Sequence, residues 1–384
     1  MNSKKWLRFI LLFALLIPLA FFLSSSNQSS KEDTDIDHQP AMKGLCWVAG
    51  DSIAQHNIDQ ITDIGSNWIS QTPFGWMNGH ESPVVVLNND RAWWGETDRG
   101  IKHTAQLAHA SGVLNMLKPH IWLRRSGDKW RSDIEMKSEE EWNQWFNSYK
   151  DWIVHYAKLA EECEIESLCI GTELYKTTSE HPDRWREIIK EIRKVYNGQL
   201  TYAANWYKEV EEITFWDDLD YIGVQAYFPL SKKDSPSKKE LIKSWTKHKK
   251  SLRKIAEKYQ KKIVFTEIGY KNTADAAREP WVWPQDSDHD ITLSDETQRI
   301  CYEALFESLW HEPWMDGIFI WKWFHSTYKY EDIESQFKAR DERRKNHTQS
   351  RGREFKPPSV FFTPQRTEVL HTLKNWYSND QRSE

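Results

Sequence analysis

The chain has 384 residues, of which 39% are hydrophobic and 28% are charged, and its net charge is −5. These fractions exclude a disordered chain and predict a packed globular protein, while the slight acidity gives no broad attraction for nucleic acid. The 22 tryptophans stand out, because flat indole rings stack on sugar rings as readily as they fill a rigid core.

The N-terminus has the pattern of an export signal. Three basic residues among the first eight precede an apolar run from Phe9 to Leu23, and a polar stretch follows. The run is short for a membrane-spanning helix, which needs about 20 apolar residues. We therefore expect residues 1–26 to be a cleaved signal peptide or an uncleaved membrane anchor, and residues 27–41 to be a polar linker. In either case we expect an exported protein, periplasmic or anchored to the membrane of a bacterial cell.

From Met42 onward, short apolar runs alternate with longer amphipathic stretches. Eight runs are apolar nearly throughout, which is typical of strands covered on both faces. They are Gly44–Ala49, Asn67–Pro73, Leu114–Ile121, Ser167–Leu174, Leu200–Trp206, Tyr221–Tyr227, Lys262–Tyr270 and Gly317–Phe324. Strands that alternate with helices form parallel β-α units, and eight such units close into a barrel. The sequence therefore predicts an α/β fold, a single (β/α)8 TIM barrel over residues 42–378.

The stretches between these runs have helical periodicity. Apolar stripes extend from Trp142 to Tyr156 and from Leu241 to Tyr259. The second stretch also carries lysines that we interpret as a solvated outer face (Lys238, Lys239, Lys243, Lys247, Lys249 and Lys250). Two long loops, Asn272–Asp290 and Ser326–Pro358, follow the last two strands, and a closing helix is expected over Pro364–Tyr377. Long loops after strands lie at the mouth of a barrel, where active sites are built.

Two glutamates end predicted strands. Glu173 ends the fourth run and Glu267 lies near the end of the seventh. A buried carboxylate is costly without a partner or a function, and these strand ends lie nearly opposite each other across the mouth of a barrel. A retaining glycosidase needs two such carboxyls about 5 Å apart, one as proton donor and base and the other as nucleophile. The alternative is that each glutamate forms a buried ion pair that stabilises the barrel.

The sequence resembles glycoside hydrolase family 113 of clan A, whose known members are β-1,4-mannanases. The resemblance covers nearly the whole chain after the N-terminal segment. It rests on Met42–Ala49, Thr72–Trp76, Met116–Trp122, Gly171–Leu174, Phe265–Tyr270 and Phe362–Gln365. It implies that Glu173 is the general acid/base and Glu267 the nucleophile of a retaining reaction, with Tyr227 donating to Glu267. It also implies a β-linked polysaccharide or oligosaccharide as substrate, with β-1,4-mannan or glucomannan the expected one.

Other polar residues are expected at the rim. Lys118 and His120, at the end of the third run, can bind sugar hydroxyls or can be a Lys–Glu pair with a structural histidine. Many clan A enzymes have Asn immediately before the acid/base, where this chain has Thr172. Asn205 on the fifth run is our candidate for the missing contact to the sugar 2-hydroxyl, and a satisfied rim amide is the alternative.

Four tryptophans are candidate sugar platforms. By the same resemblance Trp321, and not Trp323, is expected to face the mouth and form the stacking floor. Trp76, Trp281 and Trp283 are candidates for outer subsites, and packing within their loops is the alternative for each.

Rival classes fit less well. A metal-dependent barrel would carry a His-x-His pair on its first strand, which the run from Gly44 lacks, so we expect no metal and no cofactor. A missed calcium site would fall in the acidic loop (Asp286, Asp288, Asp290).

The cysteines (Cys46, Cys163, Cys169, Cys301) have no metal-type spacing and are expected to be buried thiols, with a disulfide left open. A non-catalytic sugar-binding or cell-envelope protein would be expected to lose one glutamate, whereas a hydrolase of another β-glycan stays open. We expect a monomer.

Overall fold

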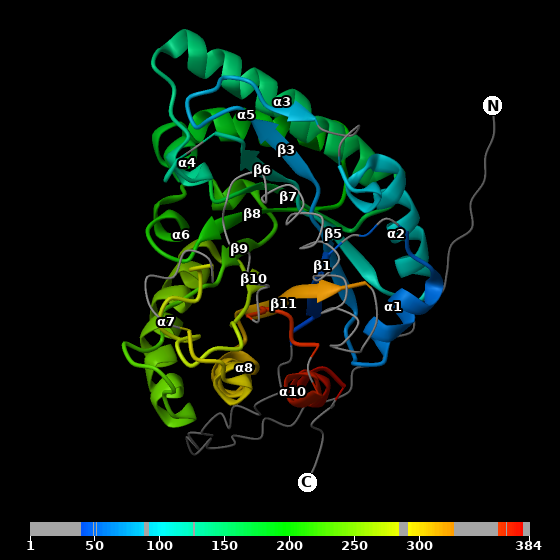
Figure 1. The fold of residues 1–384 in the computed structure, drawn as a ribbon. Coiled ribbons are helices and arrows are strands. Elements are labelled where there is room, and N and C mark those ends of the chain that lie inside the picture. The colour runs from blue at the N-terminus through cyan, green and yellow to red at the C-terminus, as the bar shows by residue number, and fades with distance from the viewer. Residues whose placement is uncertain are drawn as a thin grey trace, which may run out of the picture. The chain divides into compact units, whose positions relative to one another are not determined.

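Eight parallel strands close into a barrel (Figure 1), which confirms the predicted fold. The computed structural model describes residues 40–378 apart from 49, 51, 88–91, 126, 284–290, 326–359 and 366. In order around the barrel the strands are β1 (Met42–Val48), β2 (Trp68–Gln71), β5 (Leu114–Leu117), β7 (Ser167–Thr172), β8 (Gln199–Asn205), β9 (Ile222–Gln225), β10 (Ile263–Ile268) and β11 (Met315–Phe324). Each neighbouring pair is parallel.

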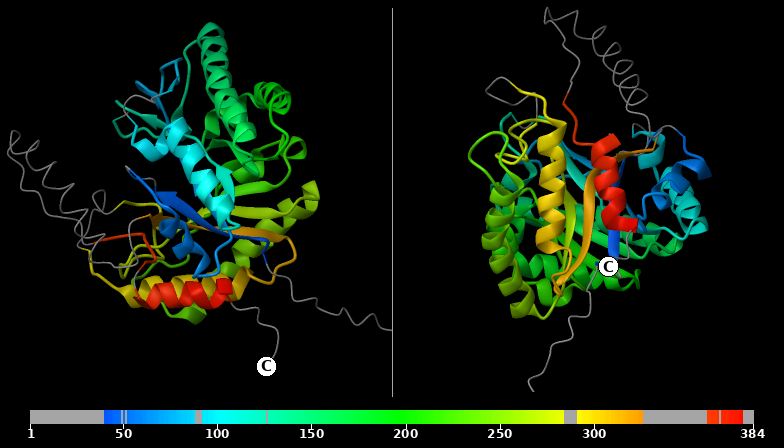
Figure 2. Two further views of the ribbon diagram at one scale, coloured as in Figure 1. Left: turned by 90° about the vertical axis from the view of Figure 1, so that its right-hand side faces the viewer. Right: turned by 90° about the horizontal axis from the view of Figure 1, so that it is seen from below.

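Helices lie around the outside of the strands (Figure 2). They are α1 (Gln55–Thr62), α2 (Asp98–Ala110), α3 (Glu139–Glu162), α4 (Tyr175–Glu180), α5 (Pro182–Arg193), α6 (Glu209–Glu212), α7 (Lys238–Tyr259), α8 (Asp295–Leu309) and α10 (Thr367–Ser378). The long ones begin where the sequence supplies a cap. The hydroxyls of Ser138 and Ser237 accept from the third backbone N–H of α3 and α7, which satisfies donors that the first helical turn leaves unpaired.

The strands alternate between two apolar layers. One set of side chains fills the barrel interior (Met42, Cys46, Trp68, Met116, Cys169, Ala203, Tyr221, Val264 and Phe319). The other set packs beneath the helices, together with fully buried indoles (Trp145, Trp185, Trp216, Trp245, Trp310 and Trp323). Because both faces of each strand are covered, the strands are apolar nearly throughout. These indoles belong to the core and not to a sugar site.

The third predicted strand is in fact two strands in two sheets. Leu114–Leu117 forms β5 of the barrel, whereas β6 (His120–Leu123) joins β3 (Phe74–Met77) and β4 (Val86–Leu87) in a separate three-stranded sheet. Pro119 lies between β5 and β6 and has no N–H for a ladder hydrogen bond. The expectation that His120 ends the barrel strand was therefore wrong, because His120 begins β6 and pairs with Phe74. Short 3-10 turns complete the chain, at η1 (Trp94–Glu96), η2 (Arg131–Asp133) and η3 (Trp216–Asp218).

All four cysteines are free thiols. Cys46, Cys169 and Cys301 are buried as predicted, whereas Cys163, just after α3, is partly exposed. In the described part of the chain, no helix combines the length and apolar character that crossing a bilayer requires. The signal or anchor segment, the acidic Asp286–Asp290 stretch and the Ser326–Pro358 loop lie outside the described residues.

Candidate active site

Glu267 is buried on β10 among hydrogen-bond donors. The Lys118 ammonium lies 2.5 Å from Glu267 Oε1, and the Tyr227 hydroxyl donates to Oε2 at 3.0 Å. Burial opposes the charge of Lys118, but the adjacent Glu267 carboxylate outweighs it and the pKa of Lys118 is raised. Burial, with the charge of Glu267, holds the pKa of Tyr227 well above its usual range, so this phenol stays a donor. Both oxygens of the Glu267 carboxyl are therefore held by hydrogen-bond donors, one of them a buried cation.

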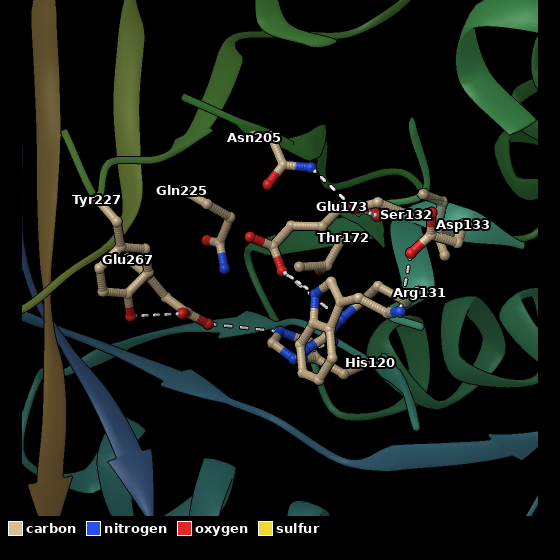
Figure 3. A network of polar contacts seen from close by, with 12 residues as sticks. His120, Arg131, Ser132, Asp133, Thr172, Glu173, Asn205, Gln225, Tyr227 and Glu267 are labelled. Carbon is tan, nitrogen blue, oxygen red and sulfur yellow. Dashed lines mark hydrogen bonds and ion pairs between the residues drawn. The ribbon is translucent and has the colours of Figure 1, made fainter. Parts of the chain in front are cut away.

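Glu173 follows β7 and has a left-handed backbone, with φ of 55°. Its backbone N–H donates to Ala203 O of β8 at 3.0 Å, and its carbonyl accepts from Ser132 Oγ at 2.9 Å. Its carboxyl Oε2 accepts from Trp130 Nε1 at 3.2 Å and lies 3.6 Å from Arg131 Nε. With these contacts the Glu173 carboxyl points into the mouth of the barrel, as the Glu267 carboxyl also does (Figure 3).

Burial raises the pKa of Glu173 above its usual range. The Arg131 guanidinium acts in the opposite direction, and the negative charge of Glu267 adds to the rise. Glu173 and Glu267 therefore interact electrostatically, but their surroundings differ. The Glu267 carboxyl contacts the Lys118 ammonium, whereas the Glu173 carboxyl lies near the side chains of Trp130 and Arg131. Environments that push two carboxyls apart in proton affinity are typical of acid and base pairs.

His120 and Arg131 connect the two carboxyls. Arg131 Nη1 lies 3.0 Å from His120 Nδ1, and His120 Nε2 lies 3.5 Å from Glu267 Oε1. Since a guanidinium only donates, Nδ1 must accept and the ring proton lies on Nε2. Burial, with the charges of Arg131 and Lys118, holds the pKa of His120 well below its usual range, so the ring is neutral. Within the described residues neither His120 Nε2 nor Arg131 Nε makes a hydrogen bond, but each lies near a carboxyl oxygen, His120 Nε2 at 3.5 Å from Glu267 Oε1 and Arg131 Nε at 3.6 Å from Glu173 Oε2.

Asn205 ends β8 beside Glu173 and has a fixed orientation. Its side-chain nitrogen donates to Glu209 Oε2 at 3.0 Å and to Ser132 Oγ at 3.2 Å, and its backbone N–H donates to Glu209 Oε2 at 2.8 Å. Both amide hydrogens are therefore used, which leaves the oxygen, an acceptor, to face the mouth (Figure 3). Burial raises the pKa of Glu209 to about 7.

The predicted tryptophans lie in three surroundings. Trp321 is half-buried against the cluster of the barrel interior, whereas Trp323 is fully buried in the outer layer. Trp76 packs against Trp122 with ring centroids 6.4 Å apart. Trp281 is 42% exposed and stacks on Trp206 at 5.6 Å, and Trp283 packs edge-on against Phe362 at 5.4 Å. The structure thus brings Glu173, Glu267, Lys118, His120, Asn205 and Tyr227 together. The rings of Trp76 and Trp281 contact β6 or loop residues, whereas Trp283 also lies 5.6 Å from the ammonium of Lys322 on β11.

Sequence reasoning missed the loop that reaches Glu173. Trp130, Arg131 and Ser132 come from the segment between β6 and α3, and Glu209 comes from the short helix α6. A Trp–Arg pair in an otherwise polar loop after the third strand was the available signal. Among the described residues no group of three or more His, Cys, Asp and Glu is placed to hold a metal ion.

An eight-stranded parallel barrel with opposed glutamates at the ends of its fourth and seventh strands has the architecture of the barrel glycoside hydrolases. The sequence profile of Glycoside Hydrolase Family 113 matches residues 48–339, and the chain belongs to this family. It is therefore a glycoside hydrolase.

Solved structures of the family are similar in fold. A β-mannanase from Alicyclobacillus acidocaldarius, in complex with ManMIm, is 24% identical with a TM-score of 0.71, and the match covers 88% of this chain and 97% of that one. A β-1,4-mannanase of the family is 21% identical with a TM-score of 0.70, covering 88% of this chain and 99% of that one. A search of curated proteins found no match.

Proposed function

We propose that this protein is a retaining β-mannanase that cleaves β-1,4-mannan or glucomannan, with Glu267 as nucleophile and Glu173 as acid/base. The observation that carries the assignment is the contrast between the two carboxyls. Glu267 is held by the Lys118 ammonium and the Tyr227 hydroxyl, whereas burial raises the pKa of Glu173. A nucleophile must be ionised and an acid must keep its proton.

In the first step Glu267 attacks the anomeric carbon. The glycosidic C–O bond breaks, a glycosyl ester forms on Glu267, and the Glu173 proton goes to the leaving oxygen. In the second step water attacks the same carbon, Glu173 takes the proton of that water, and the ester bond breaks to release Glu267 as a carboxylate. Two inversions at one carbon give net retention.

The substrate assignment rests on the family and its relatives. Two similar structures are β-mannanases by name, and this chain offers both donors and an acceptor for hydroxyl groups. Lys118, the N–H groups of His120 and Arg131, and the oxygen of Asn205 surround the carboxyls. The half-buried Trp321 offers an indole face next to the barrel interior. No metal or cofactor is part of the proposed reaction.

The test is incubation with glucomannan, galactomannan, xylan and mixed-linkage glucan, with reducing ends measured. Glu267→Ala, prepared in the same way, is the control for contaminating enzymes. Release from the two mannans, with products of retained anomeric configuration by NMR, is expected. Release only from xylan or the glucan would reassign the substrate, and inverted products would overturn the double displacement.

We further propose that residues 1–26 export the chain or anchor it, with residues 27–41 as linker and residues 42–378 as a monomeric catalytic domain. Cell fractionation, N-terminal sequencing and light scattering test these three points. Intact N-termini on soluble cytoplasmic protein would overturn export.

A further inference from the structure

Three consecutive residues outside the barrel strands converge on Glu173. Trp130 Nε1 donates to Oε2 at 3.2 Å, Arg131 Nε lies 3.6 Å from the same oxygen, and Ser132 Oγ donates to the Glu173 carbonyl at 2.9 Å. The segment is itself ordered by local contacts, because the Arg131 guanidinium lies 4.2 Å from the centroid of the Trp130 ring. The backbone N–H of Trp130 donates to Asp133 Oδ2 at 3.0 Å.

These contacts conflict with the first step of the proposed reaction. A donated N–H and a guanidinium both favour the carboxylate form of Glu173, whereas proton donation requires the acid form. Burial and the negative charge of Glu267 oppose them, and the pKa of Glu173 is raised as a net result. Other charged or titratable groups also face this carboxyl or its partners, and they are Lys118, His120, Glu209 and Tyr227.

The balance changes when Glu267 becomes an ester. Its negative charge then disappears, while Arg131 and the Trp130 N–H remain in place. Both contacts are made to Oε2 of Glu173, so Oε1 is left for proton exchange, and this oxygen points away from the loop residues and toward Gln225 (Figure 3). The same two residues that oppose the acid form in the first step favour the base form in the second.

We propose, on the basis of the double displacement above, that Trp130 and Arg131 are positioning residues for deglycosylation, which return Glu173 to its carboxylate form and present Oε1 to the attacking water. They touch the acid/base and not the reacting carbon. Their effect is expected on the second step and on the pH profile, and not on the formation of the ester.

The experiment uses the full chain with 2,4-dinitrophenyl β-mannobioside, whose leaving group needs little protonation. Trp130→Phe keeps an aromatic ring but removes the N–H, and Arg131→Lys keeps a charge but loses the planar fork. We expect Trp130→Phe to slow deglycosylation about tenfold, with a burst of dinitrophenol and a glycosyl-enzyme visible by intact mass. The alkaline limb of kcat/KM on mannan should move to higher pH, because loss of the donor disfavours the carboxylate. Added azide should relieve the slow step.

The matched control is Trp122→Phe. Trp122 is 39% exposed and packs edge-on against Trp130 with ring centroids 5.7 Å apart, so it reports on the loss of indole packing. It should leave the deglycosylation rate and the pH profile as they are in the unmodified enzyme. Trp130 is 40% exposed, so Trp130→Phe is expected to fold, and a thermal melt checks this.

A fall in ester formation without a burst or a pH shift in Trp130→Phe and Arg131→Lys would give these residues a structural role and overturn the inference. An unmodified enzyme that forms no glycosyl-enzyme and leaves mannan intact would instead overturn the proposed function. If the unmodified enzyme forms the adduct and both variants resolve it at the unmodified rate, only the inference on Trp130 and Arg131 fails.

Discussion

Glu267 and Glu173 are held by different parts of the molecule. The groups that donate hydrogen bonds to the Glu267 carboxyl, Lys118 and Tyr227, lie one and two residues after the barrel strands β5 and β9. The partners of the Glu173 carboxyl, Trp130 and Arg131, belong to the loop that joins β6 to α3. Strand ends are fixed by ladders on both sides and by the core beneath them, whereas a loop is held by fewer contacts. In the proposed mechanism, the scaffold therefore secures the carboxylate that attacks, and an added loop tunes the carboxyl that exchanges protons.

The largest effect is expected from Glu267→Ala, which removes the carboxyl that the residues after the barrel strands hold. No covalent intermediate can form, so turnover of mannan should fall by about 10⁴- to 10⁶-fold, the range seen when a nucleophile is removed. Initial rates of reducing-end release measure it. Azide should rescue Glu267→Gly with a product of inverted configuration, because it replaces the carboxylate in a single displacement. A rescued product of retained configuration would exchange the roles of the two glutamates.

On the loop side, the effect of Glu173→Ala should depend on the substrate. Turnover of mannan should fall by up to about 10⁴-fold, since general acid catalysis contributes factors of that order. Ester formation from an aryl glycoside with a good leaving group should be nearly unchanged, and azide should give a product of retained configuration. Because the raised pKa of Glu173 extends the acid form to higher pH, this variant should also lose the alkaline limb of the kcat/KM profile. Equal losses on both substrates would remove Glu173 from the acid role.

The barrel strands could be predicted from the sequence, whereas the loop that joins β6 to α3 could not. The barrel strands were predictable because burial on both faces makes each one apolar over its length. Glu173 and Glu267 were recognisable since a carboxylate at the end of such a run is an exception. Lys118 and Tyr227 also follow barrel strands, β5 and β9, so the register of the barrel brings them near Glu267.

The loop side could not be predicted in the same way. The split of Leu114–Ile121 into β5 and β6 depends on pairing with Phe74–Met77, a non-local contact that hydrophobic periodicity does not encode. Once β6 leaves the barrel, it carries the following loop over the mouth and brings Trp130 and Arg131 to Glu173. Their side chains have no periodic pattern in sequence, so the Trp–Arg pair is a weak signal and the three-dimensional path of the loop is needed to place it at Glu173.

Lys118→Met tests how far Glu267 depends on its ion pair with Lys118. It leaves a buried carboxylate without its charge partner, which costs about 3–5 kcal/mol of folding stability. Glu267 should then take up a proton more readily, so activity should fall by about 10²-fold and the acidic limb of the pH profile should move to higher pH. Lys271→Met is the matched control, since Lys271 is 2% exposed and lies 3.7 Å from Asp275. The control should lose stability without a shift of the acidic limb, and a shift in both variants would remove the specific link between Lys118 and Glu267.

The smallest effect is expected from Ser132→Ala on the loop side. This change removes the hydroxyl that donates to the Glu173 carbonyl and accepts from Asn205, a loss of about 1 kcal/mol for a hydrogen bond of this kind. The Glu173 carboxyl keeps Trp130 and Arg131, so kcat should fall less than tenfold and the pH profile should stay in place. Ser148→Ala is the matched control, because its hydroxyl also donates to a loop carbonyl, that of Val85 at 3.3 Å. A loss as large as that of Glu173→Ala would mean that the left-handed backbone of Glu173 depends on this one hydroxyl, and that the loop fixes the acid through its main chain more than through its carboxyl.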